Sequence, residues 1–368
     1  MSSTSASSAA ARRRVRFPGI SPRTYEHPAD RTALVALRRL TGFDTALRVL
    51  AGAFRERSLR LVHLASYVQV GPTQFPGLYA MVVDGSAVLD LDEVPDVFVA
   101  QGPYVNAHTL GIDKPWIVLT TGALDLYDEE ELRFVIGHEL GHVLSGHAVY
   151  RTLLHYLLAA ATRVAWVPVA GLGLRAVVFA LEEWQRSSEL SCDRAGLLVG
   201  QDIDAALRVH MKTAGGPRLA EMDAVAFLAQ AEAYESTGQV RDGVLKLLNM
   251  TGRTHPFAVQ RAAELRAWVV GGHYSTVLNG TYASRVDDES VSWRDEVSAT
   301  VRSYRDKAEA SQDPLIKTVR DMATGAADVT EDVLNRLRDR FGRKDDPGSS
   351  GSSDDDQSGP SSPGPFAG

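Results

Sequence analysis

The chain of 368 residues has a net charge of −7 and 44% hydrophobic residues, which is enough apolar surface for a globular core and excludes a wholly disordered chain. The excess of acidic over basic residues disfavours nucleic acid as a partner, because neutralising phosphates requires clustered Lys and Arg. Cys192 is the single cysteine, so no intrachain disulfide and no cysteine-rich metal cluster can form. His and carboxylate side chains must therefore hold any metal.

Composition divides the chain into four stretches. These are a basic, Ser-rich tail over 1–28, a domain over 29–280 with a motif-bearing core at 90–270, a charged helical extension over 281–343, and an acidic Ser/Gly/Pro-rich tail over 344–368. We expect both tails to be disordered, because they cannot bury enough apolar surface to offset the entropy of ordering. Phe17-Pro18-Gly19 stands where a signal peptide would need an apolar run, which predicts a cytoplasmic protein.

The first predicted elements of the domain are a helix and a small sheet. Apolar residues keep helical spacing over 44–64, with Asp44 as the N-cap. Three short β-rich runs follow at 97–99, 104–107 and 116–121, and Gly and Pro residues separate them. This pattern predicts a small antiparallel sheet.

The pattern then changes to helices. Asp128 and Glu131 have the spacing of a capping box, and the apolar residues that follow them predict a helix beginning at this point. Further helices are predicted at 189–199, 202–213, 221–236, 240–249 and 258–270. The expected fold class is therefore α+β and mostly α-helical.

The helix that follows Asp128 contains the sequence His138-Glu139-Leu140-Gly141-His142. Two histidines four residues apart lie on one face of a helix, so both can reach a single Zn²⁺ at about 2.0–2.1 Å. Glu139 lies about 100° round the helix, where it can accept a proton from metal-bound water. His147, five residues after His142, points away from the zinc face, so we predict that it supports a ligand or has a structural role and is not itself a ligand.

A catalytic zinc site normally has three protein ligands and one open position, so a third ligand is needed. No histidine follows at the metzincin spacing, which leaves a carboxylate on a second helix. Glu189 and Asp193 are four residues apart and share a face; Asp193 can accept the outer N–H of a ligating histidine. Glu182 and Glu183 remain rival ligands. Cys192 is predicted to pack as a small apolar residue behind the site.

These motifs resemble the gluzincin metallopeptidases that include the HtpX heat-shock protease and the CAAX prenyl protease. The resemblance rests on the H-E-x-x-H sequence at 138–142, the E-x-x-x-D sequence at 189–193, Thr254-His255-Pro256 with Arg261, and the upstream pair Asn106-Ala107. It implies a zincin-like fold, with a small antiparallel sheet next to the H-E-x-x-H helix, and the activity of a zinc endopeptidase.

The resemblance implies a role for each matching residue at the metal. One Zn²⁺ per chain would be held by His138, His142 and Glu189, with Glu139 as the general base. The metal would activate a water molecule and polarise the scissile carbonyl, while Glu139 would carry the proton to the leaving amine.

The remaining motif residues concern the substrate and the support of the site. The resemblance implies that His255 stabilises the oxyanion and that Arg261 anchors the helix of Glu189 by a charge pair. A turn or core position is the alternative for His255, and an ordinary surface cation is the alternative for Arg261. An exposed strand at Asn106-Ala107 would hold an extended peptide by main-chain hydrogen bonds.

Residues 149–181 decide whether the chain contacts a membrane. Integral members of the resembled family carry transmembrane hairpins between the two zinc helices. Here Arg163 and Arg175 interrupt the apolar stretch, leaving runs shorter than the roughly 20 residues that cross a bilayer. We favour a buried or interfacial hairpin and keep membrane contact as the alternative.

The function expected from the resemblance is hydrolysis of peptide bonds in unfolded or damaged polypeptides. Two alternatives stay open. One is a catalytically silent scaffold or binding protein that keeps the metal fold, and the other is a zinc hydrolase with a non-peptide substrate.

Overall fold

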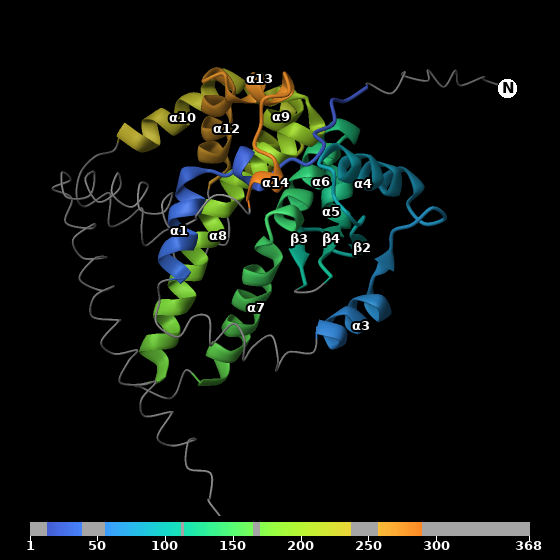
Figure 1. The fold of residues 1–368 in the computed structure, drawn as a ribbon, viewed down its shortest axis with the longest axis vertical. Helices are drawn as coiled ribbons and strands as arrows, with labels where there is room; N and C mark the ends of the chain where they lie inside the picture. The colour runs from blue at the N-terminus through green and yellow to red at the C-terminus, as the bar shows by residue number, and fades with distance from the viewer. Residues whose placement is uncertain (1–12, 39–55, 112–113, 165–169, 237–256, 289–368) are drawn as a thin grey trace, which may run out of the picture.

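The computed structural model describes residues 13–38, 56–111, 114–164, 170–236 and 257–288. The predicted helix at 240–249, the residue His255, and the predicted extension and tail from residue 289 onward lie outside these residues. Figure 1 shows a helical body with a small sheet on one side.

Four strands form one mixed sheet. They are β1 (Val68–Gln69), β2 (Asp96–Ala100), β3 (Ala107–Leu110) and β4 (Trp116–Thr120), in the spatial order β1-β2-β4-β3. β4 lies between β2 and β3 and pairs parallel with β2, while the two outer pairings are antiparallel. The expectation of an α+β fold is confirmed, but the expectation of a purely antiparallel sheet is wrong, because β3 passes to the edge and leaves the central place to β4.

Strand β3 begins at Ala107, where the predicted strand ended. Before it, the Thr120 hydroxyl donates to the carbonyl of Tyr104 at 2.6 Å and accepts the N–H of Asn106 at 3.0 Å. A side chain thus takes up backbone groups that a longer ladder would pair, so the regular strand starts later.

The helices in the described part of the chain occupy most of its length. They are α1 (Pro28–Arg38), α3 (Glu56–Ser66), α4 (Pro76–Val88), α5 (Thr121–Leu126), α6 (Glu129–Leu144), α7 (His147–Val164), α8 (Ala170–Gly200), α9 (Ile203–Gly215), α10 (Ala224–Ser236), α12 (Ala258–Val270), α13 (His273–Leu278) and α14 (Arg285–Asp288), with short 3-10 turns at Pro22–Thr24 and Leu219–Glu221. The predicted capping box at the start of α6 is confirmed: Asp128 accepts the N–H of Glu131 at 2.9 Å, and its own N–H donates to the Glu131 carboxylate at 2.9 Å.

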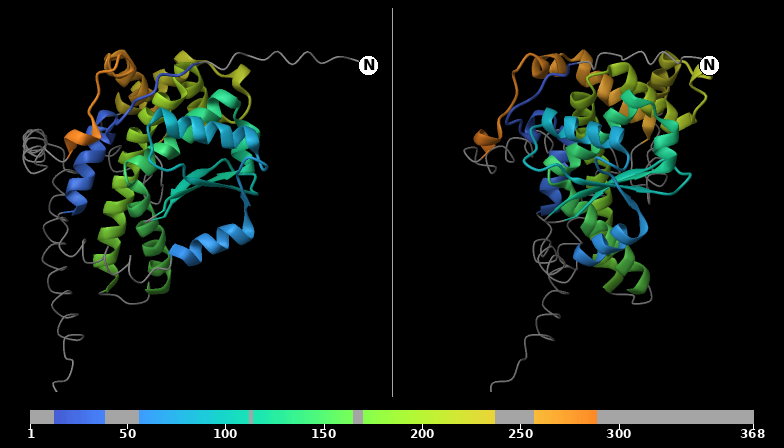
Figure 2. Two further views of the ribbon diagram at one scale, coloured as in Figure 1. Left: turned by 45° about the vertical axis from the view of Figure 1, so that its right-hand side comes forward. Right: turned by 90° about the vertical axis from the view of Figure 1, so that its right-hand side faces the viewer.

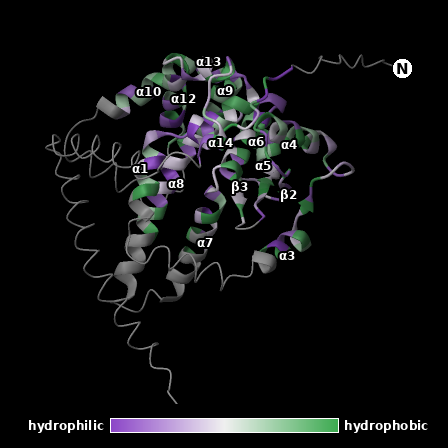
Figure 3. Cartoon of the chain, viewed as in Figure 1, coloured by the Kyte–Doolittle hydropathy of each residue, from purple (hydrophilic) through white to green (hydrophobic). Residues whose placement is uncertain are grey.

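Both faces of the sheet are covered. Val97 and Val99 pack in the main core together with residues of α4, whereas Phe98 and Trp116 pack with residues near α3. Figure 2 shows α4 and α3 on opposite sides of the strands. The strands consequently carry mainly hydrophobic residues (Figure 3), as a sheet buried on both faces requires.

Helices α6 and α8 pack side by side, and small residues set their separation. A Cβ atom added to Gly137 would stand 2.5 Å from the Cβ of Val199, and one added to Gly141 would stand 2.6 Å from the Cβ of Ala195. Only glycine allows so close an approach. The two helices that carry the predicted site residues are therefore held against each other by direct backbone contact.

The N-terminal segment is part of the core. Phe17, Ile20 and Tyr25 are fully buried, and Ile20 forms an antiparallel bridge with Ser284. The prediction of a disordered tail over 1–28 is therefore wrong for residues 13–28. These apolar residues are few and follow no helical or strand period, yet each fills a separate gap in the core.

Among the described residues, no helix is both long enough and apolar enough to span a membrane. Membrane contact through 149–181 stays the untested alternative to a buried or interfacial hairpin.

Candidate metal centre and active site

Helices α6 and α8 bring the predicted ligands together in the interior. His138 and His142 lie on α6, and Glu189 lies on α8; they are 5%, 0% and 0% exposed. The rival carboxylates lie elsewhere on α8, where Glu183 pairs with Arg186 at 2.5 Å. Within the described chain, Glu189 is thus the carboxylate that joins the two histidines.

Three donor side chains converge at this point. The Nε2 atoms of His138 and His142 are 3.2 Å apart, and they lie 3.2 and 3.4 Å from the two carboxylate oxygens of Glu189. Tetrahedral ligands at about 2.0–2.1 Å from zinc stand about 3.3 Å from one another. The spacing and the nitrogen–oxygen donor set fit a zinc ion.

A buried carboxylate supports His138 from behind. Its Nδ1 lies 3.1 Å from Oδ1 of Asp193, and Arg261 on α12 donates to both oxygens of Asp193, at 2.5 and 2.8 Å. Burial alone would raise the pKa of Asp193, but the charge of Arg261 outweighs burial and holds that pKa well below its usual range. Asp193 therefore stays ionised and able to accept the imidazole N–H.

The two histidines have opposite electrostatic surroundings. Burial alone would lower the pKa of His138, but the carboxylates of Glu189 and Asp193 raise it to about 9. Burial and the nearby charge of Arg151 lower the pKa of His142 well below its usual value. Arg151 on α7 donates from Nη1 to Nε2 of His142 at 2.5 Å and to Glu189 at 2.9 Å.

Glu139 lies beside the donor atoms on the next position of α6. Its side chain is buried, and the hydroxyl of Thr109 on β3 donates to Oε2 at 2.6 Å. The predicted proton acceptor is thus fixed by a hydrogen bond from the sheet.

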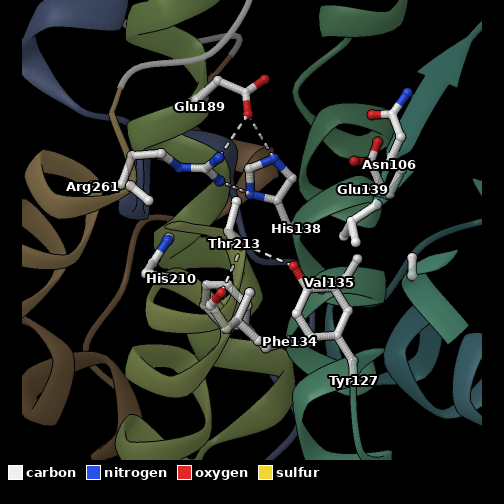
Figure 4. A pocket seen from close by; sticks show the side chains of 15 residues that line it. Asn106, Tyr127, Phe134, Val135, His138, Glu139, Glu189, His210, Thr213 and Arg261 are labelled. Carbon is white, nitrogen blue, oxygen red and sulfur yellow. Dashed lines mark hydrogen bonds and ion pairs between the residues drawn. The ribbon is translucent and has the colours of Figure 1, made fainter. Parts of the chain in front are cut away.

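A cavity of about 230 Å³ opens in front of these groups. Figure 4 shows Asn106 and Glu139 on one side and Arg261 and His210 on the other, with His138 between them. Asn106 and Ala107 line the cavity, as does His210 of α9, whose Nε2 lies 3.8 Å from Asp193. The space is suited to a substrate that reaches the donor atoms from the edge of the sheet.

Sequence reasoning placed most of these residues but missed several. It did not find Arg151, Thr109 or His210, which belong to no motif and lie on elements whose arrangement is set by the tertiary fold. His147 was predicted to lie off the zinc face; its ring lies against that of His142, with centroids 5.3 Å apart.

This fold and this cluster of donors define a metallopeptidase of the zincin type. A sequence model of peptidase family M48 matches residues 74–269, and the chain belongs to that family. The resemblance to the proteases that include HtpX is confirmed.

Relatives span much of the same length. The plastoglobule-localized metallopeptidase 48 of Arabidopsis thaliana chloroplasts is 34% identical over 268 residues, covering 71% of this chain and 77% of that protein. An HtpX protease homologue of Ralstonia pickettii strain 12J is 26% identical, covering 56% of this chain and 78% of that protein. HtpX of Xanthomonas oryzae pv. oryzae is 28% identical, covering 47% and 66%. No solved structure matches the chain.

Proposed function

We propose that this metallopeptidase is a zinc endopeptidase that holds one Zn²⁺ per chain through His138, His142 and Glu189. The convergence of three buried side chains, with their donor atoms 3.2–3.4 Å apart, carries this proposal. A zinc ion bound there supplies a Lewis acid for the scissile carbonyl and lowers the pKa of a bound water towards 7.

Glu139 is the general base. Thr109 holds one oxygen of its carboxylate at 2.6 Å, which fixes the orientation of the group beside the donor atoms. Glu139 takes a proton from the attacking water and returns it to the leaving amine. His255, outside the described residues, is proposed to stabilise the oxyanion.

Asp193 and Arg261 keep His138 in position. Asp193 accepts the Nδ1–H of His138, which leaves the Nε2 lone pair directed at the metal. Arg261 contacts both Asp193 and Glu189 and ties α12 to α8; it balances the charge of Asp193 and shares that of Glu189 with Arg151.

The substrate binds along β3, the edge strand beside the cavity. The N–H and C=O of Asn106 are both hydrogen-bonded to Thr120 at 3.0 Å, so the next residue, Ala107, turns its main-chain groups towards the open side. An added peptide strand would pair with those groups. Because this pairing needs an extended segment, we propose unfolded or damaged polypeptides as substrates.

Zinc content and proteolysis of the purified full chain test this function. We expect about one zinc per chain by elemental analysis, much less in Glu189→Ala, and an unchanged amount in Glu182→Gln, a matched carboxylate change on the same helix. Wild type without zinc would contradict the metal site.

Glu139→Gln tests the chemistry separately from the metal. Zinc is expected to remain, while cleavage of casein, a disordered protein, falls about 100-fold or more. A wild type that binds zinc but cleaves no polypeptide would favour the silent scaffold instead.

Ala107→Pro tests the substrate strand, because proline has no N–H to donate. Cleavage of long peptides should fall with zinc content intact, whereas Ala107→Ser, which keeps the N–H, should behave like wild type. Unchanged cleavage by the proline variant would contradict the strand role.

A further inference from the structure

We propose that Asp30 and His147 form, together with His142, a buried carboxylate–imidazole–imidazole relay that orients the second histidine of the metal centre. Helix α1, which carries Asp30, would then help to orient a side chain of that centre. The inference rests on the proposed function, because it assigns positioning residues to a histidine proposed there as a ligand.

The contacts form a continuous line. Nδ1 of His142 lies 3.2 Å from Nδ1 of His147, and Nε2 of His147 lies 3.4 Å from Oδ2 of Asp30. All three residues are buried, with exposed fractions of 0%, 4% and 0%. Ser191 donates to the same oxygen of Asp30 at 2.6 Å and accepts the N–H of His27 at 2.8 Å, which holds the far end of the line in place.

The tautomers follow from these contacts. A neutral imidazole carries one N–H, so if Nε2 of His142 faces the metal, its Nδ1 must carry the hydrogen. That N–H donates to the lone pair of Nδ1 in His147, which places the hydrogen of His147 on Nε2, facing Asp30. Every donor in the relay therefore points away from the metal and towards the carboxylate.

The relay gives His142 the kind of support that His138 receives directly. A histidine ligand usually donates its outer N–H to a carboxylate, a carbonyl or water, and this partner fixes the ring and increases its basicity. Asp193 contacts His138 without an intermediary. For His142 the carboxylate is one ring further away, and Trp184, packed edge-on against His147 with centroids 5.3 Å apart, holds the intervening ring.

A second metal is the competing interpretation of this cluster. His142, His147 and Cys192 also bring ligand atoms near one another, with Sγ of Cys192 3.6 Å from Nδ1 of His147. Such a site would require the ring of His142 to bridge two metals as an imidazolate.

Zinc affinity measured by chelator competition tests the relay. His147→Phe keeps a ring of similar shape and removes both nitrogens, so we expect zinc to bind about 10- to 100-fold more weakly. His147→Gln, whose amide oxygen can accept the N–H of His142, should recover part of the loss. Asp30→Asn should weaken binding about 10-fold without any change next to the metal.

His63→Phe is the matched control, because His63 is also buried and accepts the indole N–H of Trp116 at 2.9 Å, away from the donor atoms. It is expected to lower the melting temperature and leave zinc affinity unchanged. The absorption bands of the Co²⁺-substituted protein should shift in the His147 variants and not in the His63 variant.

The outcomes separate the relay from the metal site. One zinc in wild type, loss in Glu189→Ala, and affinities within twofold of wild type in both His147→Phe and Asp30→Asn would overturn the relay alone. Two zinc ions per chain would replace it with the second metal site. A wild type that binds no zinc would overturn the proposed function and the relay together.

Discussion

The two histidines of α6 that we propose as metal ligands lie in different surroundings. His138 faces two carboxylates, which raise its pKa to about 9, whereas His142 faces the cation of Arg151 and the ring of His147, and its pKa lies well below the usual value. These surroundings favour the protonated form of His138 and the neutral form of His142. Because metal binding requires both rings unprotonated, a proton must leave the His138 side when zinc binds.

Among the residues around His138, Arg261 is expected to contribute most to stability. Arg261→Met would leave the buried carboxylate of Asp193 without its cation and would remove one of the two cations beside Glu189, so we expect the free energy of unfolding to fall by about 3–5 kcal/mol. Urea unfolding with a chelator present measures this. Arg266→Met, an exposed change on the same helix, should have little effect; equal losses in the two variants would contradict the charge-balancing role.

Asp30, behind His142 and His147, makes the stability of the protein depend on pH. Burial raises the pKa of Asp30 from 3.8 to about 6. Between pH 3.8 and about pH 6, Asp30 binds its proton more tightly in the folded than in the unfolded state. The free energy of unfolding therefore falls as the pH rises through this range, and the loss is complete above about pH 6. The ionised group then costs about 3 kcal/mol, and about half of that at pH 5.

Asp30→Asn removes that ionisation. Relative to wild type, the variant should be more stable at pH 7.5 than at pH 5 by about 1–2 kcal/mol, in thermal or urea unfolding with a chelator present. Ser191→Ala, which keeps the carboxylate and removes a hydrogen bond to it, should steepen the dependence. A stability difference that is the same at both pH values would contradict the assignment.

Arg151 is expected to oppose metal binding. Its Nη1 lies 2.5 Å from Nε2 of His142 and 2.9 Å from a carboxylate oxygen of Glu189, so the guanidinium and a zinc ion on the proposed ligands would compete for the same atoms. Arg151→Leu should destabilise the metal-free chain by about 2 kcal/mol and strengthen zinc binding about 10-fold. Chelator competition and unfolding measure both effects, with Arg133→Leu, whose partner is Asp84, as the control. Weaker zinc binding in Arg151→Leu would show that the arginine instead supports the ligands.

The smallest effect concerns the support behind α6. The hydroxyl of Tyr25 lies 3.0 Å from Oγ of Ser145, the C-cap of that helix. Tyr25→Phe should cost about 1 kcal/mol of stability and leave zinc affinity unchanged, because the contact does not reach His142. A change in zinc affinity would show that Tyr25 also helps to position His142, in addition to Asp30 and His147.

The sequence predicted which side chains of α6 and α8 lie together better than it predicted the sheet. The spacing of His138 and His142, and of Glu189 and Asp193, depends only on helix geometry, and a capping box is a local signal. Whether β4 pairs parallel or antiparallel with β2 depends on where β3 goes, which no local pattern records. The result was a correct fold class and a wrong strand pairing.

The same limit explains the missed contacts. Asp30 and Arg151 belong to helices outside the motifs, and each meets the site only through tertiary packing. Phe17, Ile20 and Tyr25 are buried singly, so they lack the periodicity that identifies a packed face. His147 was placed off the zinc face by helical geometry, but nothing local indicated that Asp30 would lie behind it.

The contact of Ser21 with Ala283 and with Asp288 of α14 has a consequence for folding during synthesis. The N–H of Ser21 donates to the carbonyl of Ala283 at 2.9 Å, and the hydroxyl of Ser21 donates to Asp288 at 2.8 Å. On a ribosome, residues 13–25 are made long before residues 283–288, so their apolar side chains stay in water until these partners have emerged from the exit tunnel. Such late closure is slow and exposes apolar surface, so this enzyme is expected to depend on chaperones while it is being translated.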